Sequence, residues 1–201
     1  MSEQNQNFKM VAKTFFGFEK ILANELRNLG AGNVEIGVRN VSFEGDKGFM
    51  YKANLCCRTA IKILKPIAEF RAMNEDVLYR RIQKMNLRAF MNVKTTFAIN
   101  ATVSGDIFTH SQYVAFKVKD AIVDKFRKEE DVRPDVDVKH PDIRLNIHIQ
   151  GYWCTVSLDS SGASLHHRGY RTMTNIAPIN EALAAGLILM SGWEGQCDLL
   201  D

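Results

Sequence analysis

The chain has 201 residues, of which 46% are hydrophobic and 24% are charged, and its formal net charge is +3. This length holds one ample domain or two small ones, and the composition excludes a disordered or low-complexity protein. The small positive charge permits a nucleic-acid partner but does not require one.

The N-terminus and the cysteines indicate a cytoplasmic protein. The first nine residues, MSEQNQNFK, are polar and lack the apolar run of a secretory signal. No stretch of about 18 apolar residues predicts a membrane-spanning helix, so we expect no membrane partner. The four cysteines, at positions 56, 57, 154 and 197, form no C-x-x-C pair, and we expect free, buried thiols in a reducing compartment.

The first third of the chain predicts a ferredoxin-like domain. Residues 8–13 alternate as in a strand, and apolar residues at helical spacing then run from Phe18 to Leu29, before Gly30. Residues 34–38 and 41–43 alternate on either side of a tight turn, which predicts a β-hairpin. A helix over 46–56 and a β-branched run over 61–64 complete the order β-α-β-β-α-β. This order is the split βαβ, ferredoxin-like arrangement, which we assign to residues 1–72.

The following elements predict a second, separate small α/β domain over residues 73–165. A short amphipathic helix fits 75–85, an alternating strand fits 97–104, and a longer helix fits 111–128. Residues 129–142 contain two prolines and indicate a loop. Two further strands, 145–150 and 152–158, follow around Gly151 as a single turn residue.

The tail, residues 166–201, leaves two interpretations open. Pro178 suits the first turn of a helix, and residues 179–190 are apolar on almost every side, as in a buried helix. Residues 197–201 (CDLLD) have the pattern of a short buried strand, whose backbone groups need a partner. Either the helix folds back on its own domain, or a larger α/β domain follows residue 201. We favour the second interpretation.

Three segments resemble the THUMP-containing guanine-N2 RNA methyltransferases of the RlmL/YpsC type. They are residues 16–26 (FGFEKILANEL), 157–171 (SLDSSGASLHHRGYR) and 177–193 (APINEALAAGLILMSGW). The resemblance implies an α+β fold with an N-terminal ferredoxin-like domain, a THUMP domain, and a linker helix leading to a Rossmann-like methyltransferase domain. Asp201 would then stand at the edge of the family's S-adenosylmethionine motif, D-P-x-C-G-S-G-T, and the rest of that motif would follow it.

The resemblance also implies a function. The two domains would bind structured RNA, rRNA more readily than tRNA, and present one guanine to the protein's own C-terminal methyltransferase domain, where the base is flipped into a pocket. S-adenosylmethionine would be the cofactor of the full-length enzyme. This chain contains no N-P-P-[YF] motif, so we expect no catalytic residue in it and no activity from it alone. The alternatives are a tRNA guanine-N2 methyltransferase, the front end of a thiouridine synthetase, and a non-catalytic RNA- or protein-binding adaptor.

Candidate RNA-binding residues are cations for phosphates, joined by polar or aromatic groups for exposed bases. One patch combines both kinds with a flexible glycine: His166, His167, Arg168, Tyr170 and Arg171. A second lies on the outer face of the long helix: Lys117, Lys119, Lys125, Arg127 and Lys128. A third is the cluster of Arg80, Arg81, Lys84 and Arg88.

A fourth candidate is the loop over 104–111, since a helix N-terminus favours a phosphate, although Ser111 is equally explained as a helix N-cap. The five histidines lack the spacing of metal ligands, and we expect no metal site.

Overall fold

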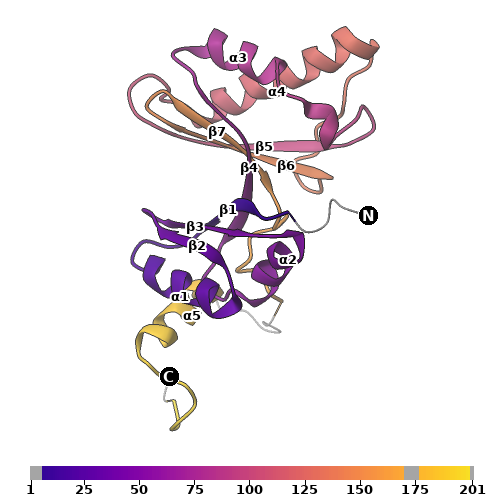
Figure 1. The fold of residues 1–201 in the computed structure, drawn as a ribbon. Helices are drawn as coiled ribbons and strands as arrows, with labels where there is room; N and C mark the ends of the chain where they lie inside the picture. Colours follow the sequence, from indigo (N-terminus) through magenta and orange to yellow (C-terminus); the bar gives the residue numbers. More distant parts are fainter. Residues whose placement is uncertain (1–5, 170–176, 200–201) are drawn as a thin grey trace. The chain divides into compact units, whose positions relative to one another are not determined.

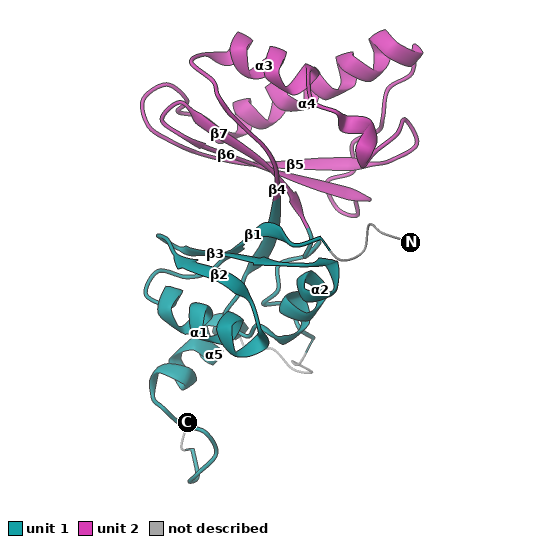
Figure 2. Ribbon diagram, in the orientation of Figure 1, with its two compact units in different colours: residues 1–65, 160–201 teal, residues 66–159 magenta. Residues whose placement is uncertain are grey.

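The computed structural model describes residues 6–169 and 177–199 (Figure 1). Tyr170, Arg171 and Asp201, three residues singled out from the sequence, lie outside these ranges. The chain divides into unit 1, residues 1–65 and 160–201, and unit 2, residues 66–159 (Figure 2). Residues 160–165, which we assigned to the second domain, join unit 1 in this division, where Leu165 N donates to Ile61 O over 2.8 Å.

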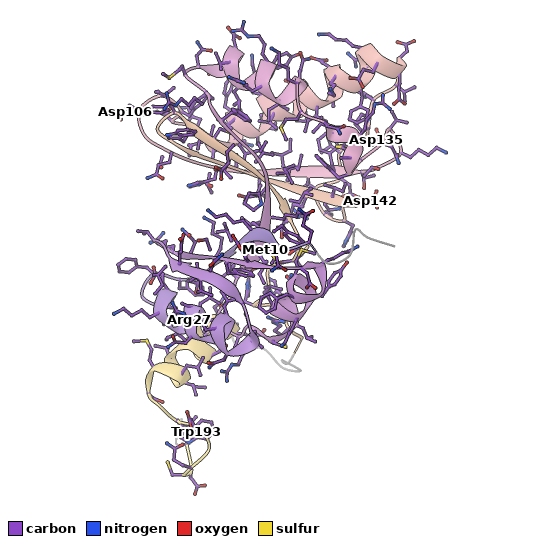
Figure 3. The ribbon with its side chains drawn as sticks, in the orientation of Figure 1. Met10, Arg27, Asp106, Asp135, Asp142 and Trp193 are labelled. Carbon is purple, nitrogen blue, oxygen red and sulfur yellow. The ribbon has the colours of Figure 1, made fainter. Side chains whose placement is uncertain are left out.

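Unit 1 has the predicted β-α-β-β-α-β order. Its elements are β1 (Phe8–Lys13), α1 (Glu19–Leu29), β2 (Gly32–Ile36), β3 (Asn40–Gly45), α2 (Lys47–Cys56) and the first part of β4 (Lys62–Arg71). The strands lie in the order β2-β3-β1-β4 and pair antiparallel. Alternation along β1 buries Met10 and Ala12 against the helices, and Met10 lies inside the unit (Figure 3).

Two glutamates of the segment over 16–26 fix the loops of unit 1. The carboxylate of Glu19 accepts from Gly17 N and Arg39 N, both over 2.8 Å, and the second bond holds the β2–β3 turn. The buried carboxylate of Glu25 accepts from Arg58 Nε over 3.0 Å and from Thr59 Oγ1 over 2.6 Å. Both side chains therefore serve the fold, which gives a physical reason for their place in this segment.

Unit 2 contains the last part of β4 and the predicted α/β elements. They are α3 (Glu75–Gln83), a 3₁₀ turn η1 (Leu87–Ala89), β5 (Phe97–Ser104), α4 (Ser111–Glu130), β6 (Ile143–Gln150) and β7 (Trp153–Asp159). The strands lie in the order β4-β7-β6-β5, with β5 and β6 parallel and β6 and β7 antiparallel. The β6–β7 turn holds two residues, Gly151 and Tyr152, so the expectation of a single turn residue is wrong.

Helices α3 and α4 cover one face of the unit 2 sheet (Figure 1). Leu145, Ile147 and Ile149 of β6 are buried in the same cluster as Val118 and Ile122 of α4. Side chains alternate along a strand, so the residues between these point to the opposite, helix-free face of the sheet. On β6 this face carries the polar side chains of Asn146, His148 and Gln150.

The tail differs from the sequence prediction. Helix α5 (Glu181–Met190) begins after Asn180, whose side chain accepts from Ala182 N and Leu183 N. Pro178 therefore precedes the helix, and its expected place in the first turn is wrong. Gly186 of α5 packs on Phe18, where an added Cβ would lie 2.1 Å from a ring carbon. The helix thus folds back on unit 1, but the expectation that it is buried on all sides is not met, since Met190 is 62% exposed.

Residues 197–199 form no strand, so the predicted buried strand at the end of the chain is wrong for its described part. A strand needs the backbone of a neighbouring strand. Here the carbonyl of Cys197 accepts instead from Trp193 Nε1 over 2.8 Å, and Leu199 is half exposed.

The four cysteines are free and differ in burial. Cys57 and Cys154 are buried, and desolvation raises the pKa of each thiol to about 12. Cys56 and Cys197 are exposed, so the expectation of buried thiols is wrong for these two. Cys56 ends α2, a helix that turns Ala53 towards the core and leaves its last residues in solvent.

Candidate RNA-binding surfaces

The guanidinium of Arg168 caps the C-terminal end of α2. Its Nη1 donates to Asn54 O over 2.9 Å and to Leu55 O over 3.2 Å, and its Nη2 donates to Cys57 O over 2.7 Å. The backbone N of Arg168 donates to the Glu181 carboxylate over 3.0 Å, which ties this segment to the start of α5. A cation at a helix C-terminus is stabilising. The guanidinium that we expected to face phosphates therefore has its partners within unit 1.

Of the two histidines beside it, His166 is partly buried and His167 is exposed. The rings of His166 and His167 lie 3.8 Å apart between centroids, and His166 Nδ1 lies 2.7 Å from Ser164 Oγ. Within the described part of this patch, His167 is therefore the residue best placed for a base or phosphate contact.

Most of the α4 cations have acidic or aromatic partners. Lys119 pairs with Asp120 over 2.8 Å, and Lys125 is held by Glu129 over 3.1 Å and by the carbonyl of Gln83 over 2.8 Å. Lys117 Nζ lies 5.6 Å from the centroid of the Tyr79 ring, and Arg127 reaches Asp124 over 4.0 Å. Within the described ranges Lys128 is exposed and has no ion pair. The helix thus offers fewer open charges than its composition indicates.

Among the cations of α3 and η1, some also have acidic partners and others do not. Arg88 donates to Glu129 from Nε over 3.1 Å and from Nη2 over 3.0 Å, and it also pairs with Glu130. Arg80 Nε donates to a backbone carbonyl one turn earlier in α3. Arg81 and Lys84 are exposed and have no carboxylate partner among the residues that the structure describes. We call Arg80, Arg81, Lys84 and Lys128 the open cations of unit 2.

The loop over 104–111 ends at the N-terminus of α4. Thr109, His110 and Ser111 line an open hollow with Tyr113 and Phe116. The N-cap residue is His110, whose side chain makes no capping bond, and Ser111 is the first helical residue. The prediction that Ser111 is the N-cap is therefore wrong by one position, because the helix already begins with the bond from Val114 N to the carbonyl of residue 110.

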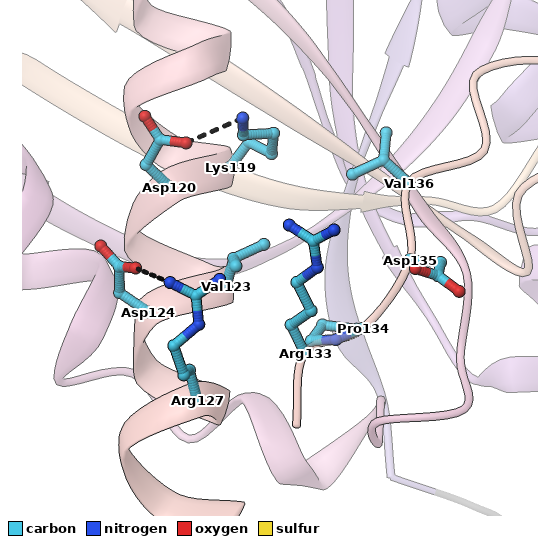
Figure 4. A pocket seen from close by; sticks show the side chains of 9 residues that line it. All are labelled: Lys119, Asp120, Val123, Asp124, Arg127, Arg133, Pro134, Asp135 and Val136. Atoms are coloured by element: carbon cyan, nitrogen blue, oxygen red, sulfur yellow. Dashed lines mark ion pairs between the residues drawn. The ribbon is translucent and has the colours of Figure 1, made fainter. Parts of the chain in front are cut away.

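A groove of about 360 Å³ lies between α4 and the loop over 133–136 (Figure 4). Its polar lining consists of three cations and three carboxylates: Lys119, Arg127, Arg133, Asp120, Asp124 and Asp135. The opposite charges balance, so the groove has little net attraction for a phosphate. Arg133, which extends into this groove from an irregular loop, was not among the residues predicted from the sequence.

The described residues, 6–169 and 177–199, also limit other kinds of site. No three of their histidine, cysteine, aspartate and glutamate side chains converge as metal ligands would. None of their helices combines the length and the apolar character needed to cross a membrane.

Comparisons with known proteins identify the two domains. The model of the RlmL ferredoxin-like domain matches residues 9–64, and that of the THUMP domain matches residues 72–159. The ribosomal RNA large subunit methyltransferase K/L of Syntrophotalea carbinolica is 44% identical over 177 residues, which are 88% of this chain and 25% of that protein. The protein of the same name from Desulfotalea psychrophila is 38% identical over 194 residues, covering 96% of this chain and 27% of the relative.

A solved structure supports the fold. SMU.472, a putative methyltransferase complexed with SAH, is 28% identical with a TM-score of 0.79, over 94% of this chain and 50% of that one. The chain spans about a quarter of the length of the curated relatives that it matches. It contains a ferredoxin-like domain of the RlmL type over residues 9–64, followed by a THUMP domain over residues 72–159.

Proposed function

We propose that this chain is the RNA-binding and substrate-positioning part of an S-adenosylmethionine-dependent guanine-N2 methyltransferase that acts on large-subunit rRNA in the cytoplasm. The observation that carries this proposal is the pair of adjacent domain matches, over 9–64 and 72–159. Two relatives at 44% and 38% identity, both named for large-subunit rRNA, support the substrate class. The solved neighbour with bound SAH supports S-adenosylmethionine as the cofactor of the whole protein.

Binding of RNA to unit 2 would use cations that no carboxylate already holds. Each phosphate contact releases counterions from the RNA, so affinity falls steeply as salt rises. A cation paired with a neighbouring acid gains less from a phosphate, because that ion pair must first be broken. We therefore assign the phosphate contacts to the open cations of unit 2 in preference to Lys119, Lys125 and Arg88.

The contribution of this chain to catalysis would be positioning. A base inside a helix is out of reach of a methyl donor, so the target guanine must be unpaired or flipped. Holding the surrounding RNA in one orientation lowers the entropic cost of the methyl-transfer step. We assign no catalytic residue to the chain and expect it to transfer no methyl group when supplied with S-adenosylmethionine and rRNA.

Charge-neutral variants test the RNA-binding proposal. We expect Arg81→Gln, Lys84→Gln and Lys128→Gln together to weaken binding of a large-subunit rRNA fragment and to reduce the slope of log K against log salt by about 1 for each phosphate that the variant no longer neutralises. Lys119→Gln, which removes a cation already paired with Asp120, is the matched control. Fluorescence anisotropy over a salt series measures both quantities, and an unchanged slope in the triple variant would refute the assignment.

Competition separates the two RNA substrates. We expect unlabelled large-subunit rRNA fragments to displace the labelled probe at lower concentration than tRNA does. Displacement by tRNA at the lower concentration would favour a tRNA guanine-N2 methyltransferase.

A further inference from the structure

Two exposed aromatic rings and one arginine meet at the edge of unit 2. Tyr152 and Trp153 are 39% and 48% exposed, and their ring centroids lie 6.1 Å apart. The guanidinium carbon of Arg71 lies 5.6 Å from the Tyr152 centroid and 5.0 Å from the Trp153 centroid. We call Arg71, Tyr152 and Trp153 the aromatic cluster.

The backbone holds the cluster at the junction of two strands. Gly151, with a φ of +59°, allows the tight β6–β7 turn that presents Tyr152 and begins β7 at Trp153. Ala72 N donates to Tyr152 O over 2.8 Å, which fixes the end of β4 beside the turn. The rings and the guanidinium are therefore positioned by regular structure, which lowers the entropic cost of binding.

Strand register places Trp153 on the helix-free face of the sheet. Trp153 pairs with Gln150, and Gln150 pairs with Ser104, whereas the neighbouring Cys154 and Ile149 are buried on the helix-covered side. Ser104 and Gln150 are exposed. Further along the same face, Thr102 Oγ1 lies 3.0 Å from His148 Nδ1. Stacking surface and hydrogen-bonding groups thus lie side by side, which is the combination that unpaired bases bind.

The charge of Arg71 is available to a ligand. Among residues 6–169 and 177–199, no ion pair joins Arg71 to a carboxylate, whereas Arg88 is held by Glu129 and Glu130. A single exposed aromatic residue on a protein surface needs no explanation. Two adjacent rings beneath an arginine without an acidic partner form a platform that favours a flat, electron-rich, anionic ligand, such as a nucleotide.

We propose that the aromatic cluster binds one unpaired base of the RNA, which stacks on the exposed indole of Trp153 while Arg71 contacts the base plane or its phosphate. This inference rests on the proposed RNA-binding function and extends it, because it names the structural class of RNA that unit 2 recognises. A fully paired duplex keeps its bases stacked inside the helix and has none to offer to the cluster.

The chain has two tryptophans, Trp153 and Trp193, so Trp193→Phe makes Trp153 the sole indole reporter. The probes are an RNA hairpin with an unpaired loop and a blunt duplex of equal length, titrated to equal occupancy by anisotropy. We expect the hairpin to quench Trp153 fluorescence and the duplex to leave it unchanged. Binding of the hairpin without quenching, or equal quenching by both RNAs, would overturn the proposal.

Affinity provides the second readout. Trp153→Ala should weaken hairpin binding by about 5- to 100-fold, in line with base–aromatic stacking, while Trp153→Phe retains most of it. Tyr51→Ala in α2, which removes an aromatic side chain that is 58% exposed, is the matched control and should change nothing. If the chain binds no RNA, the proposed function itself fails. If it binds RNA and Trp153→Ala has wild-type affinity, only the role of the cluster fails.

Discussion

Replacing Arg168 with glutamine removes the cation that caps α2 and leaves the carbonyls of Asn54, Leu55 and Cys57 without their guanidinium partner. Hydrogen bonds to a charged group contribute about 1.5–3 kcal/mol each, but the side chain is half-buried and water replaces part of that stabilisation. We therefore expect the free energy of unfolding to fall by about 2–4 kcal/mol in total. Removal of the favourable charge at the helix C-terminus acts in the same direction.

Urea unfolding followed by circular dichroism measures this decrease. RNA binding by the same variant tests whether Arg168 contacts a phosphate, so the two measurements separate its role in the fold from a role in binding. Arg168→Lys keeps the charge but not the forked geometry, so we expect an intermediate decrease in stability. His167→Gln, a change at the exposed neighbour, should leave unfolding unchanged. The reasoning is refuted if Arg168→Gln keeps the wild-type unfolding midpoint while the salt slope of RNA binding falls by about 1, the result expected of a phosphate contact.

Three further predictions concern buried and hydrogen-bonded groups. Glu25→Ala leaves the N–H and hydroxyl of Thr59 without their acceptor and should cost about 2–4 kcal/mol in urea unfolding, whereas a cost below about 1 kcal/mol would contradict the role of this carboxylate. A thiol reagent should modify two cysteines in the folded chain and four in urea, because Cys57 and Cys154 are buried with pKa values of about 12, and reaction of a third thiol before unfolding would contradict this. The backbone N–H and hydroxyl of Thr96 lower the pKa of the Asp142 carboxyl in the folded chain. The ionised carboxylate therefore stabilises the fold at pH values above its pKa in the unfolded chain, and this stabilisation is lost as pH falls through its pKa in the folded chain. Asp142→Asn should therefore flatten the acid side of the stability–pH profile below about pH 4, and an unchanged profile would be the contrary result.

Local periodicity predicted most of the elements because burial follows it directly. The inward residues of α4, at 114, 118, 121, 122 and 126, are the ones buried in the structure, and Gly30 ends α1 in the left-handed region at a φ of 102°. The tail was less predictable. Whether an apolar helix such as α5 is covered depends on what packs beside it, and hydrophobicity within the helix carries no information about that.

The candidate RNA-binding surfaces were only partly predictable, because the sequence gives the charge of a side chain but not the acidic residue that pairs with it in the fold. Lys125 and Arg88 have the charge of phosphate ligands, yet Glu129 pairs with both in the structure. Arg168 belongs to the segment with the strongest resemblance to the family, and its guanidinium serves the fold by capping α2. A resemblance to a family therefore does not distinguish residues that bind RNA from residues that hold loops and helix ends in place.

The aromatic cluster had no local signal in the sequence. Arg71 ends β4 and Trp153 begins β7, about 80 positions later, and only the sheet brings them together. Adjacent Tyr152 and Trp153 after a turn glycine are a weak indication of a presented aromatic pair. The cation that completes the cluster becomes evident only from strand order.

The most direct measurement is the affinity of the 201-residue chain for a hairpin-containing fragment of large-subunit rRNA, followed from low to high salt with tRNA as competitor. If the chain is the RNA-binding front part of an rRNA methyltransferase, it binds the fragment at low salt, and the slope of log K against log salt corresponds to the release of several counterions. Unlabelled tRNA then displaces the fragment less readily than unlabelled large-subunit rRNA does. Absence of salt-dependent binding to any RNA at low ionic strength would contradict that role.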